Sequence, residues 1–281
     1  MNTSTMRFKV HSSLLERDYF RHFLRSQLFK DQISGKATGS AQLNFGPAHV
    51  KVVEVPLPAK AEQEAIAKAL NDADALIDSL ERLIAKKRQI KQGAMQELLT
   101  GTQRLPGFNE KWRKLSLGEI LSVKHGKDQK LVENIQGEIP ILASGGRIGT
   151  SSAFLHNKPS VLIRRKGTIN KPQFIDQPFW TVDTLFYTEI FETNVAKFIY
   201  YRFCLIDWMK YNEASGVPSL NARTIEAITI EIPKHIEQTA IATILSDMDA
   251  DLAALDTKLT KARQIKQGMM HHLLSGDIRL E

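Results

Sequence analysis

The sequence is poor in cysteine and contains no long apolar run. Cys204 is the only cysteine among 281 residues, which excludes an intramolecular disulfide framework and is typical of a protein of the reducing cytosol. It lies in the apolar run 203–206, so we expect it to be a small core residue. No stretch of 18 apolar residues is present, so no membrane-spanning helix is expected. These absences predict a cytoplasmic protein with no membrane partner.

Several catalytic motifs are missing as well. The ten prolines include no adjacent pair, so the Asn/Asp-Pro-Pro-Tyr/Phe motif of adenine-N6 methyltransferases is absent. There is no G-x-x-x-x-G-K-[ST] phosphate loop, and Gly145-Gly146…Gly149 does not match G-x-G-x-x-G. His271 and His272 are adjacent in an expected helix, so we expect them to point to different faces. We therefore predict a chain that is not an enzyme and that binds no cofactor and no metal.

The formal net charge is +7 and the isoelectric point is about 9.4. Such a balance permits a polyanionic partner without requiring one. A basic soluble protein with no nucleic-acid partner is the alternative that charge alone leaves open.

The strongest pattern is an internal repeat. Residues 57–105 and 232–280 align without a gap at an offset of 175, and 24 of the 49 positions are identical. A repeat of this length indicates two copies of one structural unit. A proline precedes and a glycine follows each copy, which predicts a long helix over about 62–100 and a second helix over the equivalent residues.

Each copy carries a seam of apolar residues at alternating spacings of four and three, which is typical of a coiled coil. A helix of this length needs a packing partner for its seam. The seam residues are Ile66, Leu70, Ala73, Ile77, Leu80 and Ile84 in the first copy, and Ile241, Leu245, Met248, Leu252, Leu255, Leu259 and Ala262 in the second.

Charge predicts the orientation of the two helices. Residues 59–81 carry six acids and two bases, residues 82–92 carry five bases and no acid, and the second copy repeats this gradient. Two such helices attract each other when antiparallel, so we expect an antiparallel pair within one molecule, related by a pseudo-two-fold axis. The alternative is that the gradient serves only the helix dipoles. Gly93 and Gly268 lie inside the helices, where either a close backbone approach or a kink would account for them.

The segment between the helices reads as mixed α/β. Strands are expected over 138–142, 159–163 and 224–232, a helix over about 195–211, and loops over 144–149 and 164–171. The first segment resembles only the end of this domain, because 38–44 matches 215–221. A helix over 19–32 and a short strand ending at Glu54 complete the likeness. About half of a domain is therefore missing from the first copy.

Two globular segments, each followed by the same long helix, resemble the specificity subunit of type I restriction–modification systems. The resemblance covers nearly the whole chain and depends on the order of many short motifs. Those of the helices are Pro58, Glu62-Gln63, Asp74, Lys91 and Leu98-Leu99-Thr100-Gly101, with their copies Pro233, Glu237-Gln238, Asp249, Lys266 and Leu273-Leu274-Ser275-Gly276. Those of the middle domain are Trp112, Leu117-Gly118-Glu119-Ile120, Gly126, Ile139-Pro140, Ser144-Gly145-Gly146, Arg165-Lys166-Gly167 and Trp180-Thr181-Val182-Asp183-Thr184.

The resemblance implies an α+β chain with an antiparallel coiled coil. Its parts would be a partial target-recognition domain over 1–57, a first helix over 58–105, a complete domain over 106–231 and a second helix over 232–281. It also implies a non-catalytic DNA-specificity subunit that reads one half of a split double-stranded DNA target. The helices would set the gap between half-sites and dock adenine-N6 methyltransferase subunits, through which the nuclease–translocase subunits join.

Basic and hydrogen-bonding residues in the middle domain are candidates for the DNA face. Arginine and lysine neutralise phosphates, and arginine and asparagine also contact base edges. A solvated basic hairpin is the alternative. The candidates are Lys124, Lys127, Ser144, Gly146, Arg147, Arg164, Arg165, Lys166, Thr168, Asn170 and Lys171.

The short first segment departs from the family pattern, which has two complete recognition domains. We consider three origins: a truncated or rearranged gene, self-association that brings two complete domains together, and a separate chain that supplies the missing part. The alternative function is a regulatory fragment that binds methyltransferase without productive DNA recognition. Methylation mapping distinguishes the two functions.

Overall fold

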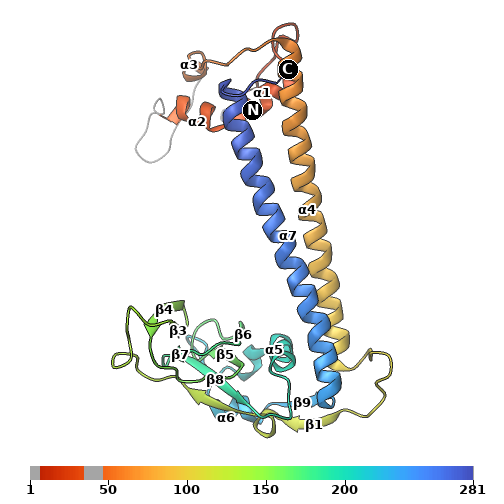
Figure 1. Ribbon diagram of the computed structural model, residues 1–281, viewed down its shortest axis with the longest axis vertical. Coiled ribbons are helices and arrows are strands. Elements are labelled where there is room, and N and C mark those ends of the chain that lie inside the picture. The colour runs from red at the N-terminus through yellow and green to blue at the C-terminus, as the bar shows by residue number, and fades with distance from the viewer. Residues whose placement is uncertain (1–6, 35–46, 281) are drawn as a thin grey trace. The chain divides into compact units, whose positions relative to one another are not determined.

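The computed structural model describes residues 7–34 and 47–280. The chain forms two compact units, Met1–Lys87 with Asp251–Glu281 (unit 1) and Arg88–Ala250 (unit 2). The long helices α4 and α7 run through both units (Figure 1). Among the described residues, no helix combines the length and the apolar character that a membrane span requires.

The elements follow the expected order of helical segment, long helix, mixed domain and long helix. The α-helices are α1 (Arg17–Arg25), α2 (Gln27–Ser34), α3 (Pro47–Val50), α4 (Lys60–Thr100), α5 (Ala196–Leu205), α6 (Ala222–Ala227) and α7 (His235–Ser275), with 3-10 turns at Leu117–Glu119 and Trp208–Tyr211. The strands are β1 (Arg113–Ser116), β2 (Leu121–His125), β3 (Ile139–Ala143), β4 (Gly146–Ser151), β5 (Ser160–Arg164), β6 (Gln173–Ile175), β7 (Trp180–Thr181), β8 (Leu185–Ile190) and β9 (Thr229–Ile232).

Unit 2 contains three small sheets. Their strand orders are β2-β8-β5-β6, β4-β3-β7 and β1-β9. All pairs are antiparallel except β3 with β7. One core joins the inner faces of β2, β5 and β8 to α5 and to the ends of the long helices, with Phe198, Ile199 and Leu245 fully buried. The mixed α/β domain is therefore anchored directly on the helix pair.

The long helices pair antiparallel through contacts that the repeat makes equivalent. In unit 2 the Lys91 ammonium is paired with the Asp249 carboxylate, and in unit 1 Lys266 is paired with Asp74. The two pairs are related by the offset of 175, which is the signature of a pseudo-two-fold axis. Both lysines are less than one-fifth exposed, so these pairs are screened less than surface pairs. The predicted antiparallel coiled coil is confirmed.

The glycines inside the helices do not meet the partner helix. A Cβ added at Gly93 or at Gly268 would have no heavy atom within 4 Å, so the proposed close approach of the two helices at these positions is wrong. Replacing either glycine by alanine should raise the free energy of unfolding by about 1 kcal/mol, because alanine restricts the unfolded chain and favours helix. Urea denaturation of G93A and G268A measures this gain, and a loss of stability in either variant would contradict the assignment.

The first segment folds like the end of the complete domain. In both copies a buried glutamine at the start of the long helix accepts a hydrogen bond from the N-cap residue of a packed helix. Gln63 Oε1 accepts from the N–H of Glu16, which caps α1, at 2.8 Å. Gln238 Oε1 accepts from the N–H of Val195, which caps α5, at 2.9 Å. Helix α1 is therefore the counterpart of α5.

Two of the predicted helices are interrupted. The helix expected over 19–32 breaks at Ser26, whose hydroxyl donates to the Phe23 carbonyl and accepts from the N–H of Phe29. The helix expected over 195–211 ends at Leu205 and resumes as the 3-10 turn Trp208–Tyr211. In both segments the apolar residues continue past the observed helix end, so the apolar pattern alone predicted too long a helix.

The prediction of a strand that ends at Glu54 is wrong, because residues 51–59 form no strand. Its counterpart β9 pairs with β1, and the first segment has no equivalent of β1 among its described residues. The side chain of Gln32 fills this role by bonding both the N–H of Glu54 at 2.8 Å and its carbonyl at 2.9 Å. The matching residues 38–44 lie outside the described residues.

Three further expectations about unit 2 need correction. The strand expected over 224–232 begins as helix α6, because Asn221 caps it by accepting from the N–H of Thr224 at 2.8 Å, and only β9 is strand. The loop expected over 144–149 is mostly β4, the second strand of a hairpin. Cys204 is exposed and not part of the core.

His156 makes unit 2 sensitive to acid. Its ring packs against those of Phe179 and Tyr187, at centroid distances of 5.8 and 5.4 Å, and burial lowers its pKa below the ordinary 6.5. The unfolded chain therefore binds the proton more tightly, and the free energy of unfolding should fall as pH drops below about 6.5. The variant H156F should flatten this fall in urea titrations between pH 5 and 7.5. An unchanged slope in H156F would assign the sensitivity to other groups.

Candidate nucleic-acid interface

The segment 180–184 connects three separate parts of unit 2. The N–H of Lys127, just after β2, donates to the Thr181 carbonyl at 2.8 Å. The N–H of Ser144, in the β3–β4 turn, donates to the Thr184 hydroxyl at 3.2 Å. The N–H of Arg165, just after β5, donates to the Thr184 carbonyl at 3.0 Å. We call 180–184 the junction segment, and it brings candidates from three elements to one end of the sheet.

Strand register explains why β2 and β5 end together. Both strands pair with β8, and His125 lies opposite Phe186 while Arg164 lies opposite Leu185. Lys124, the residue before His125, projects beside Glu189 with its ammonium 3.5 Å from that carboxylate. The ends of β2 and β5, which are distant in sequence, thus lie on either side of the start of β8.

A backbone contact fixes the chain between Lys124 of β2 and Lys127, which follows the strand. A Cβ on Gly126 would lie 2.1 Å from the carbonyl oxygen of Val182, so only glycine fits here. The indole N–H of Trp180 donates to the Lys127 carbonyl at 3.0 Å on the other side. Lys127 is therefore held at the junction segment, with its side chain exposed.

The β3–β4 hairpin supplies Ser144, Gly146 and Arg147. Gly146 has a φ of 114°, a conformation that L side chains rarely adopt, and so permits the tight turn. Arg147 is exposed, and its Nε donates to the Gly149 carbonyl only at 3.4 Å. Its guanidinium is therefore available to a ligand.

The end of β5 combines two arginines with an acid. Arg165 donates to the Asp183 carboxylate at 2.6 Å, and the Nδ1 of His125 lies 3.7 Å from the same carboxylate. Arg164 is partly buried, and its Nε has no acceptor among the described residues. The backbone of Lys166 forms an isolated antiparallel β-bridge with Ser219, and the residue is exposed to solvent.

Three candidates lie apart from this group. Thr168, Asn170 and Lys171 are exposed, on either side of Ile169, which is 1% exposed and anchors the loop. In the described part of the chain no hydrogen bond or ion pair joins them to the junction segment. Contacts with the junction segment hold three candidates: Lys127, Ser144 and Arg165. Gly146, Arg147, Arg164 and Lys166 lie next to these in the chain, and Lys124 is paired with Glu189 instead.

Residues not among the candidates complete the site. Asp183 and Thr184 bond candidates directly, and His125 lies beside Asp183. The sequence places Asp183 and Thr184 only within the motif 180–184, and neither was among the predicted site residues. Nothing in the sequence indicated that His125 would lie beside it, because that proximity depends on strand register.

One cluster outside this site could hold a metal ion. The ligand atoms of His271, His272 and Asp277 lie within 4.8 Å of one another, and all three residues are exposed. The expectation that the histidines point to different faces is wrong, because their ring centroids are 5.0 Å apart. The helix ends at Ser275, and the turn that follows brings Asp277 back to within 3.5 Å of His272.

Comparison with known proteins identifies the family. The family described as the Type I restriction modification DNA specificity domain matches residues 1–92 and 109–266. The type I restriction enzyme MjaX specificity subunit of Methanocaldococcus jannaschii is 25% identical over 93% of this chain and 67% of its own length. The EcoKI specificity subunit of Escherichia coli is 29% identical over 54% of this chain and 36% of its own length.

Solved structures share the fold. The S subunit of a type I restriction–modification system from M. genitalium has a TM-score of 0.68 at 19% identity, covering 94% of this chain and 74% of that one. The HsdS subunit from Thermoanaerobacter tengcongensis has a TM-score of 0.53 at 17% identity, covering 95% and 72%. Both are longer than this chain.

Proposed function

Because the chain belongs to the family of type I restriction–modification DNA specificity domains, we propose that it is a non-catalytic specificity subunit whose complete domain reads one half of a split DNA target. The observation that supports this most is that the end of β2, the β3–β4 turn and the end of β5, each next to basic residues, all bond the junction segment. Such a surface meets the phosphates, while arginines and serines within it reach base edges.

The acid in this basic surface favours a reading role over simple attraction. Asp183 holds Arg165 at 2.6 Å, which fixes the direction of that guanidinium before DNA arrives. An oriented arginine matches the two acceptors of guanine in the major groove, and a carboxylate accepts from cytosine. A surface that bound DNA only through its positive charge would bind phosphates more tightly without Asp183, because the carboxylate repels them.

The repeated helices are proposed to dock methyltransferase subunits. The run Arg88 to Gly93 is identical to Arg263 to Gly268. Exposed residues of the two runs include Gln89 and Ile90 in the first and Ile265 in the second. Identity at exposed positions is not needed for packing of the helices themselves. Two copies of one partner, recognised through the same residues, would account for it. Nuclease–translocase subunits would join through those partners.

We propose domain limits of 1–57 for the partial recognition domain, 58–105 and 232–281 for the helices, and 106–231 for the complete domain. The described residues of the partial domain contain no counterpart of strands β1 to β8, the elements that carry the proposed DNA face. One complete face per chain favours either self-association, which pairs two such faces on a palindromic split site, or a separate chain that supplies the missing strands. The same absence favours the alternative of a regulatory fragment.

The variant R164A/R165A tests DNA reading. With cognate methyltransferase bound, it should weaken binding to target DNA and flatten the dependence of log affinity on log salt by roughly one unit for each phosphate that is no longer neutralised. Fluorescence anisotropy across a salt series measures both. The control R113A/K114A removes the same charge from β1, which is not joined to the junction segment.

Equal behaviour of the two variants would refute the assignment of the DNA face. Methylome sequencing of cells that carry the chain and its methyltransferase then separates the two functions. Methylation at a split motif supports DNA reading. Bound methyltransferase without sequence-specific methylation supports the regulatory fragment.

A further inference from the structure

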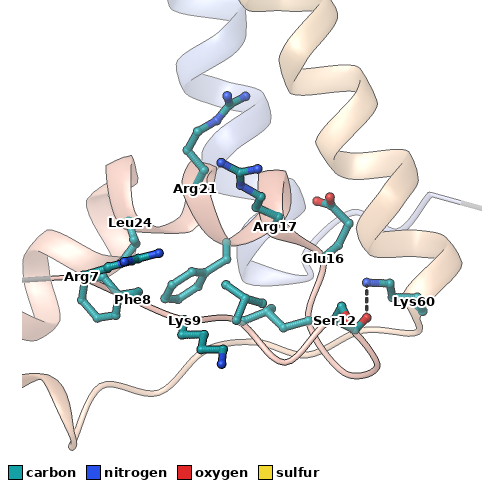
Figure 2. A pocket seen from close by; sticks show the side chains of 12 residues that line it. Arg7, Phe8, Lys9, Ser12, Glu16, Arg17, Arg21, Leu24 and Lys60 are labelled. Carbon is teal, nitrogen blue, oxygen red and sulfur yellow. Dashed lines mark hydrogen bonds between the residues drawn. The ribbon is translucent and has the colours of Figure 1, made fainter.

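Unit 1 contains a basic cavity that the proposed DNA-reading function does not use. It has a volume of about 780 Å³ and lies between the extended residues 7–10, helix α1 and the start of α4 (Figure 2). Its apolar floor includes Phe8, Phe20 and Leu24, and Glu16 is the one acid in its lining. The cations that line it are Arg7, Lys9, Arg17, Arg21 and Lys60.

The cavity lies where the complete domain has a sheet. Since Glu16 and Val195 are equivalent caps, Phe20 corresponds to Ile199 and Leu24 to Phe203 by counting along the two helices. In unit 2 both counterparts are fully buried, on the helix that packs against β5 and β6. In unit 1 the same helix face is only partly covered, by the segment 7–10.

The two copies differ in charge on this face. Arg17 stands where the complete domain has Ala196, and Arg21 stands where it has Tyr200, whose ring lies 5.8 Å from Phe174 of β6. Two neutral residues that pack under a sheet are thus arginines in unit 1, and both project from α1 toward the same side (Figure 2). A face with these arginines is unsuited to cover an apolar sheet and suited to hold an anion.

Most of these cations have no internal partner. Arg7, Lys9 and Arg17 form no hydrogen bond or ion pair with any described residue. Lys60 donates to the Ser12 carbonyl at 3.0 Å, which leaves its charge unneutralised (Figure 2).

The remaining charges do not neutralise the cavity. Arg21 donates to Asn71 at 2.5 Å and lies 3.6 Å from Asp18. The carboxylate of Glu16 is already occupied as the N-cap of α1, where it accepts from the N–H of Tyr19. The five lining cations outnumber the two nearby acids, Glu16 and Asp18, so the cavity carries a net positive charge.

We propose that this cavity binds the phosphodiester backbone of a nucleic acid without regard to sequence. Clustered cations around a groove attract phosphates, and an aromatic ring among them offers a surface on which a base stacks. Phe8, 40% exposed beside Arg7 and Lys9, supplies that ring. The partial domain then contributes affinity to DNA binding although its described residues include none of the strands that carry the proposed DNA face.

The test compares charge-removing and charge-keeping variants of the full chain. Binding of a random-sequence duplex and of a short oligothymidylate is measured by anisotropy over roughly 50 to 200 mM salt. Removing the three unpaired cations in R7Q/K9Q/R17Q should lower affinity on the order of tenfold and flatten the salt slope by roughly 0.9 for each phosphate that these cations neutralise. The charge-keeping variant R7K/K9R/R17K should restore both, which excludes misfolding as the cause.

A matched control removes three exposed cations elsewhere in unit 1, in R82Q/K86Q/K258Q. Weaker binding of both probes supports a backbone site, and weaker binding of the oligothymidylate alone supports a site for single strands. Equal affinities of R7Q/K9Q/R17Q and the control overturn the proposal and leave an acidic polypeptide as the ligand class. The comparison is repeated in the R164A/R165A background, so that failure of the DNA face in unit 2 and failure of this cavity are seen separately.

Discussion

Replacing Gly126 by alanine should destabilise unit 2 by about 3 kcal/mol and abolish sequence-specific DNA binding. The added Cβ would lie 2.1 Å from the carbonyl oxygen of Val182 and 2.5 Å from that of Thr181. Both obstacles are backbone atoms, so no rotamer change relieves the overlap, and β2 must separate from the junction segment. That separation also breaks the bond from the Trp180 indole to the Lys127 carbonyl.

The control for G126A is G145A in the β3–β4 turn. A Cβ at Gly145 would have no heavy atom within 4 Å, so this variant adds the same methyl group beside the same site without a clash. Urea denaturation and anisotropy on target DNA measure stability and binding for both variants. A G126A protein as stable as G145A would mean that the junction segment does not hold β2 as described.

Replacing Gln238 by leucine should destabilise the packing of α5 on α7 by about 3 kcal/mol. The side chain is 1% exposed. It accepts from the N–H of Val195 at 2.9 Å and donates to the carbonyl of Pro233 at 3.0 Å. Leucine has a similar volume but satisfies neither group, and a buried polar group without a partner costs about 1–3 kcal/mol.

The repeat makes a matching prediction for Gln63. It is also 1% exposed, and it accepts from the N–H of Glu16 at 2.8 Å and donates to the Pro58 carbonyl at 2.9 Å. Q63L should therefore destabilise α1 in unit 1 by a similar amount. Q89L, at an exposed position of α4, should be nearly neutral.

Native-state hydrogen exchange of individual backbone amides measures the effect of each variant on its own helix. Q238L should speed exchange of the amides of α5, and Q63L those of α1. If Q63L has no effect while Q238L does, the first segment is not held to its helix in the way the complete domain is, and the equivalence of α1 and α5 loses its support.

The long helices could be predicted almost to the residue. A seam at spacings of four and three, a proline before and a glycine after each copy, and a charge gradient act locally and agree with one another, and α4 and α7 begin and end close to the expected positions. Their antiparallel pairing followed from charge, and the equivalent pairs of Lys91 and Lys266 have the expected sense. The sequence did not predict the role of the interior glycines Gly93 and Gly268, because that role depends on which atoms surround them in the folded protein.

The shorter elements were less predictable. The run 224–232 looked like one strand, but the side chain of Asn221 supplies a helix N-cap that the apolar pattern does not reveal. The strand expected to end at Glu54 failed because a strand needs a neighbour, and the neighbour β1 has no described counterpart in the first segment. Strand formation depends on residues distant in sequence, whereas a helix bonds within itself.

By itself the sequence determined the repeat, the coiled coil and the list of basic residues, since each depends on residue type and spacing along the chain. Only the tertiary structure decided which basic residues share a surface. The register of β2 and β5 on β8 brings His125 and Arg164 to one end of the sheet. The junction segment then adds Ser144 and Asp183 through contacts that no spacing encodes, and the cavity on α1 lies where the described residues of the first segment form no sheet.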